Sequence, residues 1–124
     1  MIRLSKEKVL ALHGLLTEAT GGDPNIRDLD LLDSALESAF QTFDGAELYP
    51  TKEEKGARIG YALISNHAFV DGNKRIGMLV MMTFLEVNGI RLRPTAEEVV
   101  RAGLGVASGA MEYEELLAWI HDNK

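Results

Sequence analysis

The sequence predicts an all-α fold of about six helices, and three observations support this prediction. Apolar residues recur at intervals of three and four along most of the chain, a spacing typical of helices with one buried face. Pro24, Pro50 and Pro94 lie between the periodic segments and separate them, because proline interrupts helices. The alternation typical of a strand occurs only in residues 90–93. No shift in composition marks a boundary, so we expect one domain over residues 1–124.

The first two helices are predicted from their caps and from the spacing of their apolar residues. Ser5 can cap a helix that ends at the glycine pair at positions 21–22. A second helix begins at Asp28, and its apolar stripe continues along one face to Phe43. We expect residues 44–49 to form a short irregular stretch after it.

Two capping boxes predict the starts of two later helices. Each pairs a threonine with a glutamate three residues further on, Thr51 with Glu54 and Thr95 with Glu98. The two side chains in such a box satisfy backbone N–H groups that the first turn leaves unpaired. The expected helices cover residues 51–66 and 95–107.

The most apolar segment of the chain lies between these two helices. It begins at Ile76 and ends at the pair Asn88–Gly89, which is typical of a helix C-terminus. A helix that is hydrophobic nearly all round belongs at the centre of a domain. A last amphipathic helix is expected over residues 113–121.

Composition and charge exclude several classes of protein. The chain has no cysteine, which excludes disulfide scaffolds and cysteine zinc sites. Its 46% hydrophobic residues argue against disorder. With a net charge of −6 it lacks a general footprint for nucleic acid, so a bound phosphate must be met by a local cluster. The start of the chain has no apolar secretory signal, and no apolar run is long enough for a bilayer, so we expect a cytoplasmic protein with no membrane partner.

A polar segment, residues 66–75, precedes the central helix and holds the candidate chemistry. Gly72, Asn73, Lys74 and Arg75 lie at the expected helix N-terminus, where unpaired N–H groups and partial positive charge favour an anion. Two cations in the first turn oppose the helix dipole unless an anion is bound. We therefore predict a phosphate cradle at this helix start.

Asp71 and His67 add two further functions beside the cradle. Asp71 offers the hard oxygen ligand that magnesium takes between phosphates. His67 is a candidate general base, because an imidazole titrates near neutrality. Together they predict phosphoryl or nucleotidyl transfer, although the residues alone leave a structural role for His67 equally open. His13 and His121 are expected to be ordinary surface or capping residues.

The segment from His67 to Arg75 resembles the signature of the Fic/Doc family, specifically its death-on-curing (Doc) branch. Members of that branch are the toxin half of a toxin–antitoxin pair. Residues 21–28, 32–36 and 47–50 resemble the branch in order and spacing. The resemblance covers nearly the whole chain. It implies a compact Fic/Doc-type bundle with a short flap and an active site at the N-terminus of the central buried helix.

The resemblance also implies a role for each residue of the motif. His67 matches the general base that acts on a target-protein hydroxyl, and Asp71 matches the residue that holds Mg²⁺. The anion hole is matched by Asn73 with the backbone of Gly72 and Lys74, and the arginine that contacts the phosphates of the co-substrate ATP is matched by Arg75.

The same resemblance implies a flap that docks the target polypeptide. Glu47, Leu48 and Tyr49 fall where we expect the family's flap, which binds its target as an added strand. Backbone pairing of this kind makes little demand on the target's sequence.

Three positions depart from the broader Fic pattern. Ala68 replaces a proline, Lys74 replaces a glycine, and Met78 replaces a second arginine that adenylylating members use to hold ATP. The last two match the Doc branch, whose type member transfers the γ-phosphoryl group of ATP to a threonine of elongation factor Tu and so arrests translation. We therefore expect a kinase, with adenylylation of a protein hydroxyl as the alternative. A non-catalytic binding module with a Doc-like fold is the second alternative.

The sequence carries no clear internal inhibitor of the kind found in many Fic proteins. The nearest string, from Ser108 to Tyr113, has the right spacing but the wrong last residue, and we interpret it as a helix start. Restraint is then expected from a separate antitoxin. We expect its disordered segment to fold as a helix in a groove of this protein.

Overall fold

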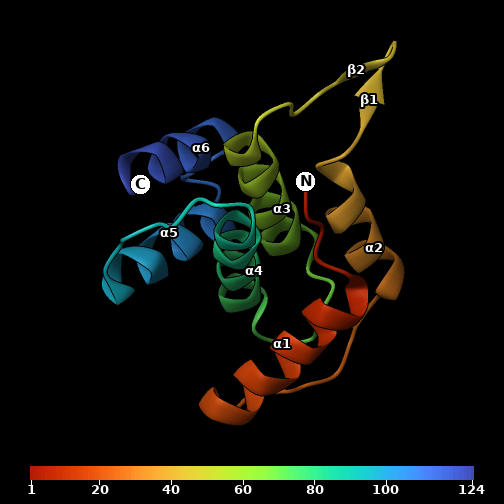
Figure 1. Cartoon of the computed structure of the whole chain (residues 1–124). Coiled ribbons are helices and arrows are strands. Elements are labelled where there is room, and N and C mark those ends of the chain that lie inside the picture. The colour runs from red at the N-terminus through yellow and green to blue at the C-terminus, as the bar shows by residue number, and fades with distance from the viewer.

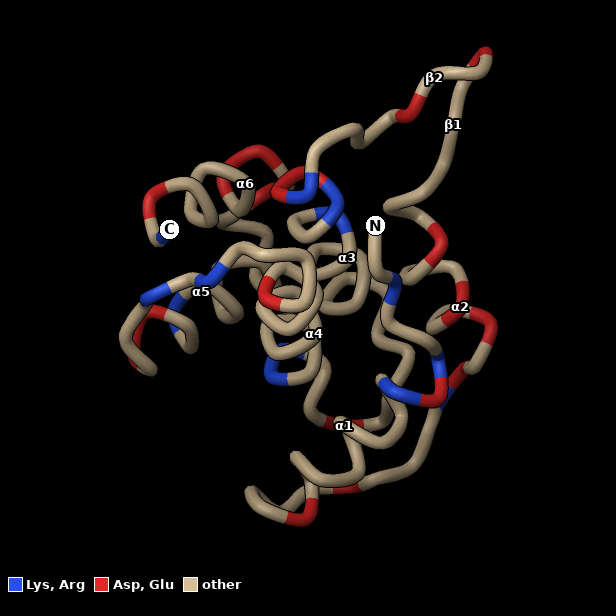
Figure 2. Tube along the Cα trace, viewed as in Figure 1, with Lys and Arg blue, Asp and Glu red and all other residues tan.

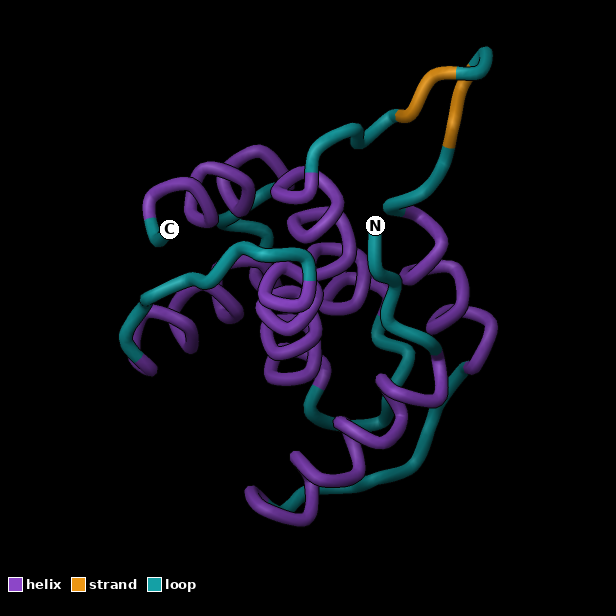
Figure 3. Tube along the Cα trace, viewed as in Figure 1, coloured by secondary structure: helices purple, strands orange, loops and turns teal.

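The computed structural model describes all 124 residues and contains six helices and one small β hairpin (Figure 1, Figure 3). This confirms the all-α class. None of the helices has the length and apolar character that a membrane crossing requires. The elements are α1 (Lys6–Thr20), α2 (Leu29–Ser38), β1 (Thr42–Phe43), β2 (Ala46–Glu47), α3 (Lys52–Asn66), α4 (Asn73–Val87), α5 (Ala96–Ser108) and α6 (Tyr113–Asp122).

Both predicted capping boxes are present at the starts of α3 and α5. The Thr51 hydroxyl accepts from the backbone N–H of Glu54 at 3.1 Å, and the Glu54 carboxylate accepts from the N–H of Thr51 at 3.2 Å. Thr95 and Glu98 repeat the arrangement at 3.1 and 2.9 Å. Because these bonds satisfy the N–H groups of the first turn locally, each helix begins one residue after its threonine.

Residues 42–47 form a hairpin where an irregular stretch was expected. The helix before it ends at Ser38, so the apolar stripe that reaches Phe43 leaves the helix. In the hairpin Thr42 pairs with Glu47 and Phe43 with Ala46. The turn between the strands, Asp44–Gly45, has φ values of 53° and 81°, which suit a tight hairpin turn and favour Asp-Gly. The alternating residues 90–93 form no strand.

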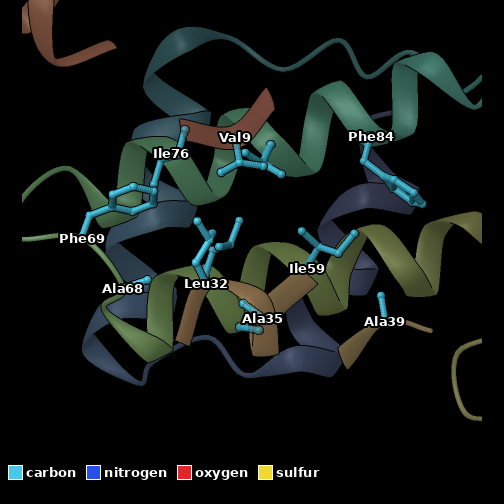
Figure 4. Close-up of a cluster of buried hydrophobic side chains, with 12 residues drawn as sticks. Val9, Leu32, Ala35, Ala39, Ile59, Ala68, Phe69, Ile76 and Phe84 are labelled. Atoms are coloured by element: carbon cyan, nitrogen blue, oxygen red, sulfur yellow. The ribbon is translucent and has the colours of Figure 1, made fainter. Parts of the chain in front are cut away.

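Helices α3 and α4 lie in the middle of the molecule, with α1 and α2 on one side and α5 and α6 on the other (Figure 1). One cluster of buried side chains joins the central pair to the first side, and Val9, Leu32 and Phe84 belong to it (Figure 4). A second cluster joins the pair to the other side and includes Met81 and Leu116. Helix α4 therefore supplies buried residues in both directions, as its all-round hydrophobicity predicts.

Close packing of the central pair depends on glycine. A Cβ at Gly77 of α4 would lie 2.5 Å from the Cγ1 of Ile64 of α3, a distance that carbon atoms do not tolerate. The two helices can therefore approach closely. This packing fixes the end of α3 and the start of α4 relative to each other, and the loop that carries the candidate chemistry joins these two ends.

Candidate active site

The loop between α3 and α4 brings most of the predicted site residues together. Helix α3 ends at Asn66, and the next residue, His67, caps it with a left-handed backbone of φ 54° and ψ 50°. Helix α4 begins after Gly72, which has a φ of 80°. The two turns face a cavity of about 180 Å³. Its lining consists of His67, Val70, Asp71, Gly72, Asn73, Lys74, Arg75 and Ala107.

The imidazole of His67 is exposed and held in one tautomer. Its Nδ1 lies 3.0 Å from the backbone oxygen of Ser65. A carbonyl oxygen only accepts, so Nδ1 carries the proton and Nε2 presents its lone pair. Nε2 has no hydrogen-bond partner within the protein. The arrangement suits a group that takes a proton from an incoming hydroxyl.

The carboxylate of Asp71 has one engaged and one free oxygen. Its Oδ1 accepts from the backbone N–H of Gly72 at 2.8 Å, whereas Oδ2 has no hydrogen-bond donor. A Cβ at Gly22 would lie 2.6 Å from Oδ2, so the carboxylate has its position only because residue 22 is glycine. One free carboxylate oxygen beside an anion site is the donor set that Mg²⁺ takes when substrate phosphates complete its shell.

The start of α4 is open to an anion. No side chain caps it, and the first hydrogen bond of the helix runs from the N–H of Ile76 to the oxygen of Gly72 at 2.9 Å. The N–H groups of Asn73, Lys74 and Arg75 consequently have no acceptor in the protein. Both cationic side chains are exposed and form no salt bridge. Figure 2 shows this basic stretch at the start of α4.

The side chain of Asn73 braces the loop instead of facing the cradle. Its Nδ2 donates to the backbone oxygen of Phe69 at 2.9 Å, and its Oδ1 accepts from the N–H of Phe69 at 3.1 Å. Both ends of the amide are thus engaged. Within the expected anion hole, the part of Asn73 that remains available is its backbone N–H.

Sequence comparison places this site in a known family. A sequence model of the Fic/DOC family matches residues 3–85, a range that contains the whole loop and its motif. The chain belongs to the Fic/DOC family. It is also 39% identical over 89 residues to "Toxin Doc" of Mycolicibacterium smegmatis, which confirms the predicted resemblance to the Doc branch. The aligned part is 72% of this chain and 66% of that protein, so the chain spans just under two thirds of that relative's length.

A segment between α1 and α2 borders the Fic/Doc motif from the outside. Ile26 forms an antiparallel bridge with Phe69, and the N–H of Val70 donates to the oxygen of Asn25 at 3.2 Å. The guanidinium of Arg27 donates to the backbone oxygens of His67, at 2.6 Å, and of Asn66, at 2.9 Å. Sequence reasoning gave Arg27 no role at the site. The one indication in the sequence that Arg27 matters was its position in residues 21–28, a segment that resembles the Doc branch.

His13 is a second residue whose place was missed, and the expectation of a surface or capping residue is wrong. Its side chain is 1% exposed, its ring stacks on Phe69 with centroids 3.8 Å apart, and its Nε2 lies 2.8 Å from the backbone oxygen of Asp71. The spacing of residues in the sequence did contain a signal for the burial of His13. His13 follows Val9 and precedes Thr17 at intervals of four, and these three residues are the buried face of α1.

The predicted flap residues do not reach the motif. Glu47, Leu48 and Tyr49 lie beside the start of α3, whereas His67 follows its end (Figure 1). A helix of 15 residues separates these two points by about 22 Å, at 1.5 Å per residue. The segment that actually borders the motif is the one around Ile26. The structure therefore places Glu47, Leu48 and Tyr49 away from the motif, and a role for them in docking the target stays a prediction.

Proposed function

We propose that this chain is a Doc-type toxin that transfers the γ-phosphoryl group of ATP to a protein hydroxyl in the cytoplasm. The observation that carries the proposal is the shared cavity: a histidine with a free Nε2, a carboxylate with a free oxygen, and an uncapped, cationic helix start all line it. The similarity to a protein named Toxin Doc supports the toxin role. A threonine of elongation factor Tu is the acceptor that the family resemblance implies.

In the proposed reaction His67 acts on the acceptor. Its Nε2 takes the proton of the threonine hydroxyl as that oxygen attacks the γ-phosphorus. The bond between the γ-phosphorus and the β,γ-bridging oxygen breaks, and ADP leaves. The bond from Nδ1 to the oxygen of Ser65 keeps the proton off Nε2 before the reaction. The same bond stabilises the imidazolium that forms, because Nδ1–H remains paired.

The start of α4 would hold the phosphates. The free N–H groups of residues 73–75 supply hydrogen bonds, and the side chains of Lys74 and Arg75 supply charge. Asp71 would hold Mg²⁺, which neutralises charge on the phosphates when it is bound.

The surroundings of Met78 support phosphorylation over adenylylation. The side chain is 2% exposed, and its Cγ lies 3.4 Å from the position of a Cβ on Gly103 of α5. A second arginine to hold ATP in the adenylylating sense is therefore missing, and α5 covers its place. Arg75 is left as the one arginine of the motif.

Labelled ATP separates the alternatives. Purified protein is incubated with elongation factor Tu, Mg²⁺ and ATP labelled at the γ or the α position. Label from the γ position on the target supports the proposal, and label from the α position supports adenylylation and contradicts it. Transfer should fall by a factor of roughly 10²–10⁴ in His67→Ala, which loses the general base. Equal toxicity of this variant on expression would favour the binding module.

In this proposal the target polypeptide binds against residues 23–26. Asn25 and Ile26 are exposed while their backbones already pair with the motif loop. A target chain lying against this segment would carry its hydroxyl to His67 without crossing the molecule. Backbone pairing at such an edge needs little sequence in the target.

We propose that an antitoxin helix covers an apolar groove next to the phosphate site. The groove, about 430 Å³, lies between α1, α4 and α5, with Lys74 and Arg75 at one end. Val100 and Leu104 are 60% and 50% exposed at its edge, which favours an apolar partner face. Leu104→Glu should abolish co-purification with the antitoxin, and the exposed Val87→Glu, on the far end of α4, should not.

A further inference from the structure

Helix α1 contacts the motif loop through a single buried polar side chain. His13 is 1% exposed and stacks nearly parallel on Phe69, with 17° between the ring planes. Its Nε2 lies 2.8 Å from the backbone oxygen of Asp71. Because a carbonyl oxygen only accepts, Nε2 carries a proton and donates it.

This hydrogen bond ends on the peptide that connects Asp71 to Gly72. Gly72 has a φ of 80°, and a Cβ there would lie 3.5 Å from Nε2 of His13. The peptide is the point at which the loop turns into α4. Its orientation sets the direction of the Asp71 carboxylate on one side and of the first free N–H groups of α4 on the other.

Packing of the ring alone does not account for the choice of histidine. An apolar ring would stack on Phe69 equally well, whereas a buried imidazole costs free energy unless its N–H is bonded. Thr17, the next buried polar residue of α1, bonds within its own helix, to the oxygen of Gly14 at 3.1 Å. His13 instead donates its hydrogen bond to a loop residue 58 positions away in sequence.

We propose that His13 is a positioning residue, whose Nε2–H fixes the Asp71–Gly72 peptide so that the carboxylate and the α4 N–H groups face the same cavity. The effect on catalysis rests on the function proposed above. The hydrogen bond from His13 to the Asp71 backbone oxygen does not depend on that function, because it is a contact between α1 and the loop. Without it the peptide can rotate, and the metal ligand and phosphate donors then point apart in part of the population.

Two matched pairs of substitutions test the donor separately from the ring. His13→Phe keeps the stack and removes the donor, whereas His13→Gln places an amide N–H close to the position of Nε2. His13→Asn carries the same amide too short to reach, which keeps the test valid even if the phenylalanine variant does not fold. Thr17→Val changes a buried polar residue of the same helix that does not touch the loop.

Hydrogen exchange in residues 68–73 and the Mg²⁺ dependence of phosphoryl transfer are measured for all four variants. We expect faster loop exchange, a higher Mg²⁺ concentration at half-maximal rate and a kcat lower by about tenfold to a hundredfold in the phenylalanine and asparagine variants, since small misplacements at a reacting centre have effects of this size. The glutamine and valine variants should resemble the parent.

Parental loop exchange and Mg²⁺ dependence in His13→Phe and His13→Asn would overturn the inference, as would a glutamine variant as defective as these two. Failure of the proposed function looks different. In that case the parent itself transfers no phosphoryl group, while hydrogen exchange still decides whether His13 holds the loop.

Discussion

Arg27 clamps the backbone of His67. Its guanidinium donates to the backbone oxygens of His67 and Asn66 at 2.6 and 2.9 Å. The last carbonyls of a helix have no intrahelical donor, and these two belong to the end of α3. A non-glycine residue with positive φ is uncommon, and His67 has a φ of 54°. The two bonds from Arg27 thus hold the proposed general base in a backbone conformation that few residues adopt unaided.

Removing the Arg27 side chain should lower kcat strongly and the free energy of unfolding only modestly. In Arg27→Ala we expect kcat to fall at least about tenfold, because His67 samples orientations that miss the acceptor. The free energy of unfolding should fall by about 1–2 kcal/mol, because the bonds are charge-assisted but the arginine is exposed. Initial rates at saturating ATP and chemical unfolding measure the two quantities.

Two controls accompany the arginine variant. Arg27→Lys has one compact donor group and should recover the rate only in part, because it cannot reach both carbonyls in a planar fork. Arg101→Ala removes an arginine whose one partner is Glu97, in an exposed pair at 2.9 Å, and should leave the rate unchanged. A parental kcat in Arg27→Ala would contradict the clamp.

The glycine pair before the motif allows a second prediction. Gly21 and Gly22 both have positive φ, 77° and 109°, so alanine strains the backbone at either position by roughly 1–2 kcal/mol. At Gly22 alone the new Cβ would meet Oδ2 of Asp71, at 2.6 Å, while nothing lies within 4 Å at Gly21. Gly22→Ala should therefore displace the carboxylate.

The comparison of these two variants tests the proposed role of Asp71 as the metal ligand. We expect Gly22→Ala to need a higher Mg²⁺ concentration for half-maximal transfer than Gly21→Ala, at similar stability. Titration of Mg²⁺ at fixed ATP checks this. Identical titrations would show that Asp71 does not hold the ion.

Elements with local signals could be predicted from the sequence. The capping boxes at Thr51 and Thr95 are closed by residues three positions away, and the central helix is apolar all round. In both cases the residues that determine the structure lie within the same short segment of sequence. The motif from His67 to Arg75 is likewise contiguous. Its residues converge in one cavity because only six residues separate the end of α3 from the start of α4.

Contacts between distant segments could not be predicted. The partners of His13 and Arg27 lie 58 and 40 residues away in sequence, and no local pattern states which loop a buried donor will face. The strands of the hairpin have two residues each, too few for alternation to show. Only the Asp44–Gly45 dipeptide marked the turn.

Tyr113 should make stability fall at high pH. Burial, followed by the charge of Glu54, raises the pKa of Tyr113 to about 12 from its ordinary value of 10.0. Between these values the unfolded chain loses the proton and the folded chain keeps it, so the free energy of unfolding decreases as the pH rises. Tyr113→Phe should flatten this decrease, whereas Tyr61→Phe, which keeps Tyr113, should retain it. Chemical unfolding at several pH values between these limits measures the slope, and equal slopes in both variants would refute the assignment.

Lys55 permits a direct test of whether the hairpin contributes to docking. Its side chain is 2% exposed, and its Nζ donates to Oε1 of Glu47 at 2.9 Å and to the backbone oxygen of Tyr49. These bonds anchor the end of β2 to α3. In Lys55→Met the hydrocarbon volume remains but both bonds are lost, so we expect a loss of about 1–3 kcal/mol in unfolding free energy and faster proteolysis within residues 42–49.

Phosphoryl transfer to the protein target should stay at the parental rate in Lys55→Met, because the hairpin and His67 are at opposite ends of α3. Lys52→Met is the matched control, since Lys52 is exposed and forms no salt bridge, and should leave both proteolysis and transfer unchanged. If Lys55→Met lost transfer to the target but kept its affinity for ATP, the hairpin would be a docking element after all. Glu47, Leu48 and Tyr49 would then bind the target far from the reacting hydroxyl, and residues 23–26 would not suffice to hold it.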